Sequence, residues 1–237
     1  EYPPYALDSL LFDFSPPAVK RGQELGHDVV TIQARALEGL RQAPKDIAGG
    51  GAAIDALLAP GGWAADLLAF RGAIVADYVG ALTTIVKEAS YGRVGVVMQA
   101  FPPPLNLLSG LDLAKVDGIA DEIAVKHYTM HWPMIERGYG ERLTAITGLN
   151  ADSVFTEVHR WLGLNGGAQT REALRYPEPH EPHPADDAAL RRTIEIAAGQ
   201  ISRSRLSVIA HGYGPPDDVE RRFRAVLEAP CRHLHIN

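Results

Sequence analysis

The chain has 237 residues, of which 46% are hydrophobic and 22% are charged, and its formal net charge is -6. This size allows one large domain with a full core, and the composition argues against disordered, fibrous and membrane classes. The negative balance gives no basic surface, and no apolar run reaches the length of a membrane span. We therefore expect neither a nucleic-acid partner nor a membrane partner.

Five short apolar runs predict strands, and helical patterns separate most of them. The predicted strands are 10–14, 93–101, 122–130, 206–214 and 233–236. Helical spacing predicts one or two helices in 18–42, a long helix over 66–89, a short one in 111–120, two pieces in 134–164, and further helices over 185–202 and 215–227. The proline-rich segment 176–184 predicts an exposed loop.

The order of these elements predicts the fold class. The run 93–101 is almost continuously apolar, as is typical of a strand covered on both faces. Strands that alternate with helices, without hairpin signals, predict a parallel sheet with right-handed crossovers. We therefore expect an α/β protein with a (β/α) TIM-type barrel, either a single domain over 1–237 or the C-terminal larger part of one whose leading strands precede Glu1.

In such a fold the site lies at the carboxyl ends of the strands, where the loops can vary. This rule selects polar and aromatic residues without any motif. The candidate catalytic residues are Asp13, Lys126 and His211. The candidate substrate-binding residues are Gln99, Tyr128, His131, Trp132, Tyr213, His235 and Asn237.

Each of these assignments has a simpler alternative. A lysine inside an apolar strand is costly to bury alone, so Lys126 predicts a carboxylate partner such as Asp13. That pair could equally be a buried ion pair with no ligand, and Asp13 could instead cap the turn that follows it. Trp132 could stack on a sugar ring or belong to the core.

The histidines allow a second hypothesis, a metal-dependent hydrolase or isomerase that uses His211, His235 and Asp13. Their spacing matches no metal signature, so we predict no metal and no cofactor. A single cysteine, Cys231, rules out an internal disulfide framework. It precedes the last strand, on the side opposite the expected site, and is not expected to be a nucleophile. We expect a soluble protein and favour a cytoplasmic location.

The stretches 10–14, 93–101, 121–128, 212–216 and 235–237 carry a resemblance. The chain resembles uncharacterised glycoside-hydrolase-like TIM barrels, distantly similar to β-galactosidase-type barrel glycosidases. The resemblance implies an acid at the end of an early strand, which Asp13 matches, and a polar cluster like 126–128 at the end of a later one. It therefore implies that the protein acts on a carbohydrate.

The sequence departs from this family in its acids. Glycosidases of this type use two carboxylates from different strands. Here only Asp13 ends a predicted strand, and Glu122 begins one. A second acid would have to come from a loop or helix, as Asp112, Glu136 or Glu141 could provide, or from a missing part of the chain. The third hypothesis is a barrel that binds sugar without cleaving it, and the oligomeric state stays open.

Overall fold

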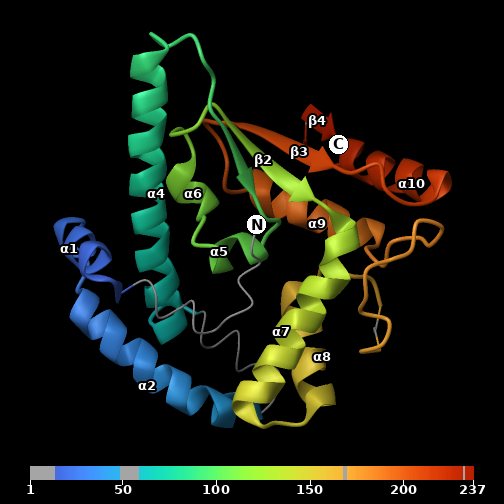
Figure 1. The fold of residues 1–237 in the computed structure, drawn as a ribbon, viewed down its shortest axis with the longest axis horizontal. Coiled ribbons are helices and arrows are strands. Elements are labelled where there is room, and N and C mark those ends of the chain that lie inside the picture. The colour runs from blue at the N-terminus through green and yellow to red at the C-terminus, as the bar shows by residue number, and fades with distance from the viewer. Residues whose placement is uncertain (1–13, 49–58, 168–169, 232) are drawn as a thin grey trace.

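The structure is a computed structural model that describes residues 14–48, 59–167, 170–231 and 233–237. Its described part is built around one sheet of parallel strands (Figure 1). The strands are β1 (Val97–Ala100), β2 (Glu122–His127), β3 (Arg205–Ala210) and β4 (His233–Ile236). Their order across the sheet is their order in the chain, and all neighbours pair in parallel. All four strands therefore end at the same edge of the sheet.

This sheet corrects the predicted barrel. The described residues form four strands, which are too few to close a TIM barrel, and β1 and β4 lie at the two ends of the sheet. Four of the five predicted strands are confirmed. The fifth, 10–14, lies outside the described residues except for Phe14, which is part of a helical turn rather than a strand. Closure depends on strand number and stagger across the whole sheet, which the local apolar pattern of each strand does not encode.

The predicted helices are confirmed with small shifts at their ends. The first half of the chain contains α1 (Pro16–Glu24), α2 (Val29–Ala48), α4 (Trp63–Ala89), α5 (Leu105–Leu108) and α6 (Leu113–Val116). The second half contains the 3-10 turn η2 (Thr129–His131), α7 (Trp132–Thr147), α8 (Ala151–Leu162), α9 (Asp187–Ala198) and α10 (Pro216–Leu227).

Local signals explain where these helices end. Gly148 adopts a left-handed conformation, with φ of 66°, and terminates α7. The Asn150 side chain accepts a hydrogen bond from the Ser153 backbone N–H and caps α8. Asp186 caps α9 in the same way through Ala189. These caps fix the lengths of the helices that flank the site.

The two faces of the sheet differ in chemistry. On one face Ile123 and Val125 of β2 pack against Leu113 of α6 and Ala197 of α9. The opposite face carries Glu122 and Lys126 of the same strand, because successive side chains alternate. A second core joins α7, α8 and α9 around Trp132 and the leucines of α8 and α9. Helices α6 and α9 therefore cover the apolar face of the sheet.

Helix α4 is the longest element, and among the described residues it alone is long and apolar enough to cross a membrane. Its first half packs against α1 and α2 through Leu67 and Phe70. An ion pair of 2.5 Å between Arg21 of α1 and Asp77 of α4 lies beside this contact. These contacts are typical of a helix in a water-soluble fold, so the structure is compatible with the predicted soluble protein.

Candidate functional site

Six aromatic and imidazole rings gather at the carboxyl edge of the sheet, and we call them the ring cluster. Two follow β2, two follow β3, and two come from the proline-rich loop 176–184. They are Tyr128, His131, Tyr176, His183, His211 and Tyr213. Parallel strands bring distant segments to this one edge, because all their carboxyl ends meet there.

Five of these rings form a closed circuit in which each ring touches the next. Tyr128 lies 6.1 Å from His131 and 5.6 Å from His211, measured between ring centroids. His131 lies 5.6 Å from Tyr176. Tyr213 completes the circuit at 5.5 Å from Tyr176 and 6.4 Å from His211. All five pairs meet edge to face or tilted, so the rings of the circuit are not stacked face to face.

Polar atoms at the rim of the ring cluster have defined roles. The amide of Asn237, which follows β4, donates to the hydroxyl oxygen of Tyr128 at 2.7 Å. The backbone N–H of Tyr213 donates to Nδ1 of His211 at 3.1 Å, so a neutral His211 carries its proton on Nε2. The hydroxyl of Tyr213 donates to the carbonyl of Pro177 at 3.1 Å and fastens the loop to the sheet.

A buried arginine of α10 joins the segments that carry the rings. Arg222 is 2% exposed, and its guanidinium donates to the carbonyl oxygens of His211 and Tyr213 at 3.1 and 2.5 Å. It also contacts the hydroxyl of Thr129 at 3.4 Å. Its charge is balanced by Asp218, one helical turn earlier, at 2.8 Å. One side chain therefore fixes the ends of β2 and β3 relative to each other.

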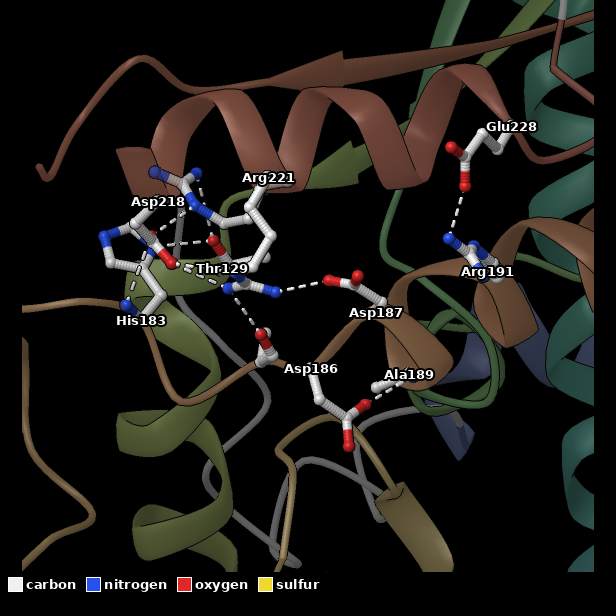
Figure 2. Close-up of polar contacts among 11 residues, drawn as sticks. Thr129, His183, Asp186, Asp187, Ala189, Arg191, Asp218, Arg221 and Glu228 are labelled. Atoms are coloured by element: carbon white, nitrogen blue, oxygen red, sulfur yellow. Dashed lines mark hydrogen bonds and ion pairs between the residues drawn. The ribbon is translucent and has the colours of Figure 1, made fainter. Parts of the chain in front are cut away.

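Asp218 extends this network to the loop (Figure 2). Its carboxylate accepts from the backbone N–H of His183 at 3.2 Å and from Arg221 at 2.7 Å. Arg221 in turn reaches Asp187 at the start of α9. Burial acts to raise the pKa of Asp218, but the hydrogen bonds from Arg221 and Arg222 outweigh it and hold the pKa below its ordinary value. Asp218 is thus a permanent anion that orders the loop.

The structure brings some of the predicted site residues together and separates others. The ring cluster and its rim contain the predicted Tyr128, His131, His211, Tyr213 and Asn237. Asp13 lies outside the described residues. Asp112 caps α6, and Glu141 pairs with Arg137 and Arg171. Glu136 is buried between His159 and Asn165.

Four further predicted residues lie away from the rings. Trp132 is 1% exposed and packs in the core, with its ring 5.4 Å from that of His127, so burial corrects its predicted stacking role. Lys126 is buried on the polar face with its ammonium 5.6 Å from the centroid of Phe101. Gln99 is exposed on β1 at the end of the sheet. His235 binds Glu122 at 2.6 Å.

Sequence reasoning missed Tyr176, His183, Asp218 and Arg222. The loop 176–184 was expected to be solvated, although the prolines around Tyr176 stiffen the chain and make a fixed position less costly. Asp218 and Arg222 are four residues apart on an amphipathic helix, which is the pattern of an ordinary surface ion pair. Only their position behind the β3 turn distinguishes them, and that position depends on the fold.

Two buried histidines belong to this region and are kept neutral. Burial lowers the pKa of His127 to about 3, and its Nε2 lies 3.0 Å from the hydroxyl of Thr193. Burial, together with the charge of Arg222, lowers the pKa of His183 to about 4. Nδ1 of His183 lies 2.6 Å from the Thr129 hydroxyl. Both rings therefore stay uncharged at pH values where an unfolded histidine is protonated.

We expect the protein to lose stability between pH 7.5 and 5.0 because of these two residues. Below about pH 6.5 these two histidines bind protons in the unfolded chain but not in the folded chain. Each of them therefore lowers the free energy of unfolding by roughly 2 kcal/mol at pH 5.0. Urea unfolding of the wild type and of His127→Gln measures this. The variant should lose about half of the pH dependence, whereas His180→Gln, a change of an exposed loop histidine, should leave it intact. An unchanged dependence in His127→Gln would contradict the assignment.

The described residues limit the possible chemistry. No group of three or more His, Cys, Asp or Glu side chains among them could hold a metal ion. Burial raises the pKa of Tyr213, and the loop carboxylates of Glu178 and Glu181 add to this effect. Of these two, Glu181 is held by Arg175 at 2.6 and 2.8 Å, which lowers its pKa to about 2. The turn residues Gly212 and Gly214 also line a groove of about 660 Å³ along α10, with walls of Val219, Phe223 and Leu227 among others. Of these two surfaces, the ring cluster brings several aromatic and imidazole rings together, whereas Phe223 is the one aromatic residue among those that line the groove.

Comparison with known proteins found no matching family model, no matching curated protein and no matching solved structure.

Proposed function

We propose that this protein binds a carbohydrate at the carboxyl edge of its sheet, with the ring cluster as the binding surface. The observation that carries the proposal is the closed circuit of three tyrosines and two histidines. Sugars present an apolar ring face beside several hydroxyl groups. Tyrosine and histidine provide the complementary pair, an apolar body and a polar tip.

The exposure of the rings supports this use. Tyr176 is 37% exposed and His131 is exposed as well, while Tyr128, His211 and Tyr213 are half-buried. Loop 176–184 is fastened by Tyr213 from one side and by Asp218 from the other. A surface that is ordered before the ligand arrives loses little conformational entropy on binding.

Binding is a better proposal than hydrolysis for the described residues. Glycoside cleavage needs a carboxylic acid whose pKa is raised and a second carboxylate on the other side of the bond. Two of the carboxylates near the rings, Asp218 and Glu181, are ion-paired and have lowered pKa values. Neither can act as the general acid near neutral pH. We retain a cytoplasmic location as the prediction for such a soluble sugar-binding protein.

Removing one tyrosine ring tests the proposal. We expect Tyr176→Ala to weaken binding by roughly tenfold, because an aromatic contact contributes about 0.5–1.5 kcal/mol beyond its buried area. Saturation-transfer NMR against methyl glucoside, methyl galactoside, lactose and cellobiose would find a ligand, and calorimetry would then measure the affinity. The matched control is Tyr91→Ala. Tyr91 is 86% exposed, follows α4 and is not part of the ring cluster.

The outcomes separate the remaining hypotheses. Equal affinity in wild type and Tyr176→Ala would remove the ring cluster from sugar recognition. Release of nitrophenol from a panel of aryl glycosides would replace a binding function by a hydrolytic one. Asp13→Asn would then test the predicted catalytic acid, since abolished release would support it and unchanged release would exclude it.

A further inference from the structure

The second half of α4 exposes an apolar stripe that the fold leaves uncovered. Tyr78, Leu82 and Ile85 are 63%, 44% and 59% exposed, and Val86 is 36% exposed. Ala89 is exposed on the same side. We call these residues, together with the exposed Ala81, the α4 stripe. In Figure 1 this half of α4 stands at the edge of the molecule, beyond α6.

The opposite side of the same helix segment faces the protein. Thr83 is 8% exposed, and a Cβ placed on Gly80 would lie 4.0 Å from Ile119. Lys87 pairs with Asp121 at 2.6 Å. At 100° per residue, these three positions lie roughly 180° from the centre of the α4 stripe. The helix segment is therefore apolar on the side that no described element covers.

The spacing of the α4 stripe fits another helix. Tyr78, Leu82, Ile85 and Ala89 are separated by four, three and four residues, which is the repeat that keeps one seam against a partner helix. The stripe is also self-complementary about a point between Thr83 and Thr84. An antiparallel copy places Leu82 opposite Ile85, Tyr78 opposite Ala89, and Val86 opposite Ala81. Large side chains thus meet small ones in both outer pairs.

The charged residues of α4 favour protein over lipid. Asp77 and Lys87 are each paired within the chain, to Arg21 and Asp121. Helices that lie on membranes carry an excess of lysine and arginine on their polar face. Here no such excess is present on α4, and the chain has a net charge of -6.

We propose that the α4 stripe is the contact surface of a homodimer, in which two copies pair their α4 helices antiparallel across a twofold axis. The stripe offers roughly 450 Å² per copy, which is close to the lower limit of about 1,000 Å² in total for a specific interface. The dimer is therefore weak and dissociates at micromolar concentration. This inference is independent of the proposed sugar site.

Sedimentation velocity over a series of protein concentrations tests the proposal. The weight-average mass of the wild type should rise from one copy toward two copies, and Leu82→Glu with Ile85→Glu should stay at one copy. The matched control is Leu227→Glu, because Leu227 is 65% exposed on α10 and should not affect the dimer. A wild type that remains monomeric at every concentration overturns the proposal, and so does a dimer that survives the double substitution.

Cross-linking tests the antiparallel register without depending on the charged variant. Leu82→Cys and Ile85→Cys are prepared separately, each with Cys231→Ser, and then oxidised alone and as a mixture. The mixture should form disulfide-linked dimers several times more efficiently than either protein alone. Equal linking of Leu82→Cys with itself overturns the register. Flotation with phosphatidylcholine vesicles, with and without phosphatidylserine, tests membrane binding. If the protein is monomeric in solution and its flotation requires Leu82 and Ile85, the stripe binds a membrane instead and the dimer proposal is overturned.

Discussion

Arg222→Met is expected to lower the free energy of unfolding by about 3 kcal/mol, the lower end of the range for breaking a buried ion pair. The substitution leaves the buried carboxylate of Asp218 with Arg221 and the His183 N–H as its partners. It also leaves the carbonyl oxygens of His211 and Tyr213 without their donor. Urea unfolding at neutral pH measures the loss. Sugar affinity should fall with it, because the ring cluster loses its common support.

Arg224→Met is the control for this experiment. Arg224 lies on the same helix and pairs with Glu220, but its side chain is 67% exposed. Exposed pairs contribute under about 1 kcal/mol, so this variant should stay near wild type. A double variant with Asp218→Leu and Arg222→Met should recover part of the lost stability. In this variant the Asp218 carboxylate no longer stays buried without the Arg222 guanidinium. Equal effects of the two arginine substitutions would contradict the structural role of Arg222.

Trp132→Ala is expected to lower the free energy of unfolding by about 3–5 kcal/mol, the usual result of removing a buried tryptophan. Trp132 is 1% exposed and contacts the core shared by α7, α8 and α9. Removing the indole leaves a cavity beneath the ring of His127. Thermal and urea unfolding measure this loss.

The same substitution separates core packing from sugar stacking. If Trp132 acts only through the core, sugar affinity of the folded variant at low temperature should match that of the wild type. Trp161→Ala provides a comparison, because Trp161 is only partly buried at the side of the same core and should cost less stability. A variant with near-normal stability and abolished binding would restore Trp132 to the site.

The elements of this fold are largely encoded locally. The short runs around Val97, Ile123, Val208 and Leu234, which contain apolar residues, predicted four strands. Asn150 determines the start of α8 because its side chain accepts a hydrogen bond from a free N–H of the first turn. Strand ends then predicted where polar residues gather. Tyr128, His211 and Tyr213 were found in this way.

The predictions that were wrong or missing concern features that depend on contacts between distant segments. The number of strands in a sheet is a property of the assembled chain, so periodicity could not distinguish an open sheet from a barrel. Trp132 follows a strand end directly, yet it starts α7 with its indole turned inward, and only the packing of α8 and α9 decides that direction. Tyr176 joins the rings from 37 residues before Tyr213, through a loop without periodicity.

The lengths of the outer strands affect how the protein avoids aggregation. In the described part of the sheet, β1 and β4 have four residues each, whereas the central β2 and β3 have six. A short outer strand offers few main-chain hydrogen bonds to a passing unfolded chain, and β4 carries the exposed polar side chains of His233 and His235. A sheet with such short outer strands can stay open, because these strands offer little backbone for the amyloid-like addition of a strand from another chain.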